Sequence, residues 1–243
     1  MNRYLIISKN ALQRGFSLIE LMVAMTIGLV LLGALAYFFL GSQQMNRSHD
    51  DVSRMQESGR NALESMGGVI RRAGYQNDTN LIAGVALALT SLDGTDGASG
   101  APDTITVQYE AQNGGEPDCT GTNIAAGAVI TQVFAIVPAT ATTPPTLTCN
   151  GGVIVDNIED MQISYGIDLG KTGSISAYET SPAANEFAGT AAVRISLLVK
   201  GPVANVATNN SQTYVYNGAS VTKTDGFLRQ VYTSTFTVRS QAR

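Results

Sequence analysis

The feature that most constrains this 243-residue chain is a run of twenty uncharged residues, Leu21–Leu40, close to its N-terminus. As a helix the run is about 30 Å long, which matches the hydrocarbon core of a bilayer. No second run of this kind follows, so we expect the chain to span a membrane once. Arg3, Lys9 and Arg14 precede the run, and the positive-inside rule keeps such residues cytoplasmic. Everything after residue 41 is therefore expected to be exported.

Glu20, at the start of this apolar region, separates two interpretations of it. The simpler one is a cleaved secretory signal, for which Ala34-Leu35-Ala36 supplies a cleavage pattern. A cleaved signal, however, has no use for a carboxylate that costs a few kcal/mol in lipid unless it finds a partner. The basic region before it is also long for a signal peptide. We therefore favour a helix that stays in the membrane.

The apolar pattern then becomes amphipathic, with apolar residues three, four or seven positions apart from Met45 to Ile70. No proline occurs before Pro102. The pattern predicts one helix from about Phe16 to Met66, ending near Gly67-Gly68 or slightly later. Its length would be roughly 75 Å. We expect the Met45–Ile70 stripe to pack against a sheet.

Strand patterns begin after Tyr75, where Thr and Gly become frequent. Apolar and polar residues alternate over 104–109, 161–168 and 193–200, and apolar residues share one face of a last strand over 228–238. The run Ala128–Val137 is more continuously apolar, which is typical of a strand covered on both faces. No helix alternates with these strands, which argues against a parallel α/β sheet. The sequence predicts an α+β domain in which an antiparallel sheet lies over the amphipathic part of the helix.

Few residues are available for catalysis or metal binding. His49 is the one histidine and lies on the polar part of the helix, so a solvated role is favoured over a catalytic one. Asp93, Asp96 and Asp103 suggest calcium but do not have EF-hand spacing, and Asp-Gly pairs are ordinary turn formers. No phosphate loop and no assignable acid–base pair of carboxylates is present. We expect no enzyme activity, no cofactor and no metal.

The charge is divided unevenly along the chain. Residues 1–75 hold eight basic and five acidic residues, net +3, and residues 76–243 hold seven and fourteen, net −7, which together give −4. Affinity for nucleic acid needs clustered Lys and Arg. We expect no nucleic-acid partner.

The segment Gly15-Phe16-Ser17-Leu18-Ile19-Glu20-Leu21-Met22-Val23-Ala24 resembles the class III signal of type IV pilins and of type II secretion pseudopilins. The resemblance implies that a prepilin peptidase cuts after Gly15 and that Phe16 becomes an N-methylated N-terminus. It also implies that Glu20 is the glutamate that sets the register between subunits. The fifteen-residue leader is longer than is usual in that family.

Four further blocks resemble the PilW family of minor pilins: residues 56–63 with 72–75, residues 158–168, residues 192–199 and residues 227–235. Two features depart from the family pattern. Asn61 stands where an aromatic residue is expected, and Gln76-Asn77 stand where members often have a cysteine. The missing cysteine puts in question whether this chain has the disulfide pattern of the family, though not whether it resembles the family.

The resemblance implies a pilin-like fold and the following division of the chain: a leader over 1–15, a transmembrane and assembly helix over 16–40, the amphipathic half of the helix over 41–75, and a periplasmic β-rich head over 76–243. It implies a minor pilin of the inner membrane that joins other minor and major pilins and promotes assembly of a type IV pilus at the cell surface. A J-type pseudopilin of type II secretion is the nearest alternative. A membrane-anchored periplasmic binding protein or enzyme and an adhesin are further alternatives.

Cys119 and Cys149 are the two cysteines of the chain. Two cysteines in an exported domain usually pair, because the compartment is oxidising. We expect a structural disulfide, since no histidine or lysine lies nearby in sequence to activate a thiolate. Two buried free thiols are the alternative.

Overall fold

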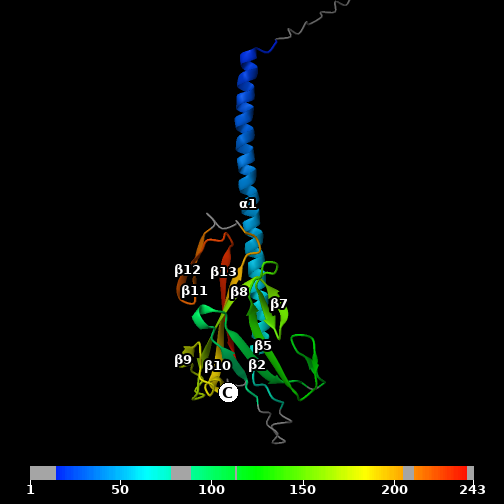
Figure 1. Ribbon diagram of the computed structural model, residues 1–243, viewed down its shortest axis with the longest axis vertical. Coiled ribbons are helices and arrows are strands. Elements are labelled where there is room, and N and C mark those ends of the chain that lie inside the picture. The colour runs from blue at the N-terminus through cyan, green and yellow to red at the C-terminus, as the bar shows by residue number, and fades with distance from the viewer. Residues whose placement is uncertain (1–14, 78–88, 113, 205–210, 240–243) are drawn as a thin grey trace, which may run out of the picture. The chain divides into compact units, whose positions relative to one another are not determined.

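The computed structural model describes residues 15–77, 89–112, 114–204 and 211–239 (Figure 1). Within these residues the chain forms one long helix, two short 3-10 helices and thirteen strands. In chain order they are α1 (Leu18–Ile70), β1 (Leu92–Thr95), η1 (Ala98–Gly100), β2 (Thr104–Glu110), β3 (Glu116–Pro117), β4 (Asn123–Ile124), β5 (Val129–Val137), β6 (Thr146–Cys149), β7 (Gly152–Asp156), β8 (Ile158–Ile167), β9 (Ala177–Glu179), η2 (Phe187–Gly189), β10 (Thr190–Lys200), β11 (Gln212–Tyr216), β12 (Ala219–Lys223) and β13 (Arg229–Thr237).

The chain divides into two compact units, one that extends to Asn46 and one from Arg47 to Arg243, which we call the head. In the first unit α1 packs against nothing that the structure describes. Its most apolar 18-residue window has a mean hydropathy of 2.4 and no buried residue. By length and composition α1 is able to cross a membrane. Its apolar side chains therefore require a bilayer or other subunits to cover them.

In the head, α1 contributes a buried stripe made of Met55, Gly59, Ala62, Met66 and Ile70, at helical spacing. The stripe confirms the core role expected for this segment, with one exception. Met45, the first residue of the predicted stripe, belongs to the other unit and is 63% exposed. The predicted helix is confirmed, and it ends at Ile70.

The strands form two main sheets rather than the single sheet expected from the sequence. One has the strand order β1-β2-β5-β6-β7 and the other the order β13-β10-β8-β9, and two small two-stranded sheets, β11-β12 and β3-β4, accompany them. Every strand pair described is antiparallel. The α+β class and the antiparallel pairing are therefore confirmed, and the division into two sheets is a correction. It arises from pairings between strands, which a strand's own pattern does not record.

The alternating patterns place the core as predicted. Ile105, Val107 and Tyr109 of β2 are buried, and so are the alternating apolar residues of β8 and β10. The prediction that the run Ala128–Val137 is covered on both faces is wrong. In β5, Ile130 and Phe134 are buried but Thr131 and Val137 are exposed, because one face of this sheet meets the core and the other does not.

Helix and last strand meet in the core of the head. The side chains of Tyr232 and Phe236 on β13 lie against Gly59 and Gly67 of α1. The two core sheets and the helix share one cluster of buried residues, which includes Met66, Phe134 and Ile195. The first and the last elements of the chain therefore close the same core.

Candidate functional site

The residues expected to carry processing lie at the start of the first unit. Gly15 and Phe16 precede α1 outside any helix, and both are exposed, Phe16 by 84%. Helical hydrogen bonding begins at the next residue, since the Leu21 N–H donates to the Ser17 carbonyl over 3.1 Å. Ser17 is a favoured residue type at such a helix start. The Gly15–Phe16 peptide bond thus lies in accessible, non-helical chain.

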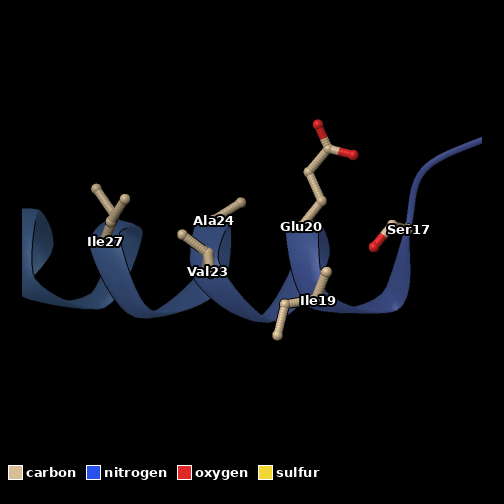
Figure 2. Close-up of a pocket in the computed structure, with 6 residues that line it drawn as sticks. All are labelled: Ser17, Ile19, Glu20, Val23, Ala24 and Ile27. Carbon is tan, nitrogen blue, oxygen red and sulfur yellow. The ribbon is translucent and has the colours of Figure 1, made fainter.

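Glu20 lies in the first turn of α1 and is exposed. Figure 2 shows its carboxylate extending away from the helix axis, on the side opposite to Ile19. It makes no hydrogen bond or ion pair with any residue in the described part of the chain. The helix dipole stabilises an acid in the first turn by about 0.3–1 kcal/mol. That is less than the few kcal/mol that lipid exacts from a carboxylate, so Glu20 needs a further partner.

An open hollow on the helix surface is lined in part by Glu20. Its lining is mostly apolar, and its polar side chains are those of Ser17 and Glu20 (Figure 2). The other lining residues are Ile19, Val23, Ala24 and Ile27. A surface of this kind suits a second apolar segment that carries a cation opposite Glu20.

The two cysteines lie in the head and form a disulfide with each other, with a Cα–Cα distance of 6.1 Å. Cys149 ends β6 and is fully buried, and Cys119 lies in the turn after β3. Asp118 orders this turn, because its carboxylate accepts the N–H groups of Thr120 and Thr122 at 2.8 and 3.0 Å. The Thr120 hydroxyl also donates to this carboxylate, and it lowers the pKa of Asp118 more than either N–H group does. The Cys119–Cys149 disulfide ties the turn after β3 to the five-stranded sheet.

Asp103, one of the residues weighed for calcium, has a structural role. Its carboxylate accepts the N–H of Gly97 at 2.8 Å and the N–H of Ile163 at 2.6 Å. Burial raises its pKa. Among the described residues no group of three or more His, Cys, Asp or Glu side chains is placed to hold a metal ion. Asp103 thus joins the loop before β2 to β8.

A second buried charge in the head has no signal in the sequence. The Arg229 guanidinium is only 1% exposed and binds the Glu159 carboxylate at 2.5 Å and the Asp225 carboxylate at 2.6 Å. Arg229 lowers the pKa of Asp225 through these hydrogen bonds. Glu159 is 70 residues away in sequence, so only the fold brings the three together. The cluster fixes the start of β13.

A cavity of about 390 Å³ in the head lies between η1, β8 and the β11–β12 hairpin. Its polar groups bond mainly to the protein itself. Gln162 donates to the Ala101 carbonyl at 3.0 Å and accepts from Asn217 at 3.3 Å, and the Tyr216 hydroxyl donates to the Ser196 carbonyl. Burial raises the pKa of Asp160 at its wall. His49, on exposed helix surface, does not line this cavity.

Two family models match the sequence. The prokaryotic N-terminal methylation motif matches residues 10–36, which include Gly15, Phe16 and Glu20. The type IV pilus-assembly protein W model, PilW, matches residues 135–240. The chain thus carries an N-terminal methylation motif and, over its C-terminal part, a segment similar to PilW. The match contains the sequence blocks noted at 158–168, 192–199 and 227–235, and it leaves the block at 56–63 outside.

No curated protein sequence matches the chain. Among solved structures, the type IV-like pilin TTHA1219 from Thermus thermophilus is similar, with 14% sequence identity and a TM-score of 0.47. The similarity covers 80% of this chain and 97% of that chain.

Proposed function

We propose that this protein is a non-enzymatic minor pilin that takes part in assembling a type IV pilus. The observation that carries the proposal is the unpartnered Glu20 carboxylate on an exposed apolar helix, inside a matched N-terminal methylation motif. An enzyme or a binding protein anchored in a membrane has no need of a charge at this place. The PilW match favours the pilus over the pseudopilus of type II secretion.

In this proposal, residues 1–15 are a leader that a prepilin peptidase removes after Gly15, and Phe16 becomes an N-methylated N-terminus. Residues 16–40 hold the protein in the inner membrane and later pack in the filament, residues 41–75 continue the helix, and residues 76–243 complete a periplasmic head. The α-amino group of Phe16 on a neighbouring subunit supplies the cation that Glu20 lacks. The ion pair forms only when two subunits are staggered along the filament axis, so it fixes their register.

Mass spectrometry of the membrane-derived protein tests the processing step. The expected N-terminus is N-methylated Phe16, and replacing Gly15 by Val should leave the leader attached, because the peptidase needs a small residue there. Ser17→Ala, which keeps Gly15 and Phe16, is the matched control and should be processed normally. An N-terminus at Tyr37 would instead establish the secretory-signal interpretation.

Glu20→Ala tests the register. The variant should insert and fold normally, because the change removes a charge that lipid disfavours, but it should co-purify less with the other pilins. Ser17→Ala, in the same hollow, should co-purify like the wild type. Unchanged assembly of the Glu20→Ala protein would contradict the ion-pair argument.

Deletion of the gene separates the pilus from type II secretion. Loss of surface pili and twitching motility, with secretion intact, is expected for a minor pilin. Loss of secretion with pili intact would assign the protein to the pseudopilus. Restoring the gene on a plasmid is the control for effects on neighbouring genes.

A further inference from the structure

The strand β13 presents a free edge whose direction can be read from its hydrogen bonds. At one end of the β10–β13 pair the Gly201 N–H donates to the Leu228 carbonyl, and at the other end the Val238 N–H donates to the Ala191 carbonyl. Even-numbered residues of β13 therefore point their backbone groups toward β10. Since backbone groups alternate along a strand, those of Val231 and the later odd-numbered residues point to the other side.

Gln212 confirms this direction at the first residue of the strand. The Arg229 N–H donates to Oε1 of Gln212 at 2.6 Å, and Nε2 of Gln212 donates to the Arg229 carbonyl at 2.8 Å. The side-chain amide thus makes both bonds that a neighbouring strand would make. It occupies the edge at Arg229 only.

Beyond this cap the edge is long, and no strand of the described residues pairs with it. The outward N–H and C=O groups of Val231, Thr233, Thr235 and Thr237 bond to no residue in the parts of the chain that the structure describes. β13 has nine residues, whereas the other three outer strands of the two main sheets, β1, β7 and β9, have four, five and three. Proteins usually protect such an edge by keeping it short or by placing Lys or Pro on it. The edge of β13 has neither beyond Arg229.

A groove of about 380 Å³ runs beside this edge, between β13 and the part of α1 that belongs to the head. Leu63, Tyr232 and Phe236 give it apolar walls, and Arg60, Glu64 and Arg71 give it charge. Arg71 lies over the Phe236 ring, with its Cζ atom 5.4 Å from the ring centroid.

The charge in the groove is net positive. Arg60 and Arg71 supply two positive charges against one negative charge from Glu64, and none of the ion pairs within the described residues involves either arginine. A bound segment that carries acidic side chains would neutralise this excess.

We propose that β13 accepts an extended segment of a different protein as an additional strand, with acidic side chains of that segment facing Arg60 and Arg71. Alternate side chains of an added strand project to the same face, about 7 Å apart. Those on the groove side therefore meet the two arginines and Leu63, and those on the other side continue the threonine face of β13. Main-chain hydrogen bonds supply affinity and the groove supplies selectivity. The cap at Arg229 makes Val231 the first residue available for pairing.

Two fluorescent nine-residue peptides test the proposal on the full chain in detergent, by fluorescence anisotropy. One alternates valine with glutamate and the other alternates valine with lysine. The glutamate peptide should bind and the lysine peptide should not. Thr235→Pro removes one outward N–H at a position where an edge strand tolerates proline, so binding should weaken about tenfold. Thr235→Val keeps that N–H and should bind like the wild type.

Amide hydrogen exchange of the wild-type protein keeps the test independent of how the proline variant folds. Addition of the glutamate peptide should slow exchange at Val231, Thr233 and Thr235. Equal binding of both peptides, or no change at these amides, overturns the proposal. Protection of the same amides that rises with protein concentration, without peptide, would show that a second copy of this chain occupies the edge and would also overturn it.

Discussion

The ring of Tyr232 lies directly over Gly59, so that a Cβ atom on this glycine would be 2.6 Å from Cδ2 of the ring. Phe236 and Gly67 repeat the relationship, with 2.7 Å from such a Cβ atom to Cδ1. Eight residues of a helix and four of a strand both advance by about 12–14 Å. The matched spacing lets the two rings fit the two glycines along one line of contact.

Replacing either glycine by alanine should therefore destabilise the head. Gly59→Ala or Gly67→Ala forces the ring or the helix to move, and we expect a loss of about 1–3 kcal/mol, as is usual for overpacked cores. Denaturant unfolding of the detergent-solubilised protein, followed by tyrosine fluorescence, measures the loss, since seven of the nine tyrosines lie in the head.

Gly68→Ala is the matched control on the same helix. Gly68 is exposed and a Cβ atom there meets nothing within 4 Å, so the helix should gain up to about 1 kcal/mol from the better helix former. Equal effects at positions 59, 67 and 68 would contradict the packing explanation.

Removal of the disulfide should cost the head about 3–4 kcal/mol, because the bond closes a loop between residues that are 30 positions apart. The double variant Cys119→Ser, Cys149→Ser and the reduced wild-type protein should lose similar amounts in denaturant unfolding. Thiol labelling of the unfolded, unreduced wild type should find no thiol, and two after reduction. Two reactive thiols before reduction would contradict the bridge.

Arg229→Met should destabilise the head by about 1–3 kcal/mol, because it leaves Glu159 and Asp225, both partly exposed, close together without their cation. Asp225→Asn should cost about 1 kcal/mol or less, since Asp225 is 43% exposed and solvent screens its interaction. The difference between the two unfolding free energies is the measurement. A smaller effect of Arg229→Met than of Asp225→Asn would contradict the buried cluster.

Low pH should remove the contribution of Asp225 to the free energy of unfolding. Arg229 holds the pKa of this carboxyl below its usual value, so the ionised form stabilises the folded state. The stabilisation is complete above the unfolded pKa of about 4 and is lost as the pH falls through the lower, folded pKa. The free-energy difference between the wild type and Asp225→Asn should therefore be constant from pH 7 to about 5 and shrink below pH 4. A constant difference down to pH 2 would contradict the assigned cause.

The helix, the main strands and the processing residues could be predicted because each depends on local periodicity or on a contiguous motif. The apolar run after Glu20, and the alternation from Ile105 to Tyr109, need no knowledge of distant residues. The Cys119–Cys149 pairing could be predicted because the chain has two cysteines and the exported domain is expected in an oxidising compartment.

Relationships between distant segments could not be predicted in this way. Within a helix, Gly59 and Gly67 indicate only a residue type that destabilises helices. The fold shows that they leave room for the rings of Tyr232 and Phe236. The cap that Gln212 places on Arg229 joins residues 17 positions apart, and no pattern within β11 or β13 marks it. The prediction that the run Ala128–Val137 is covered on both faces was wrong, because composition does not tell which face of a strand meets the core.

The closure of one core by the first helix and the last strand has a consequence for biogenesis. A ribosome releases Gly59, Met66 and their neighbours more than 150 residues before it releases Tyr232 and Phe236. Contacts over such separations form late, because a long loop must close first. Until β13 has been synthesised, the helix surface around Gly59 and Gly67 lacks the two aromatic rings that cover it. A nonsense codon at the start of β13 would remove Tyr232 and Phe236 and leave this part of the helix without its cover.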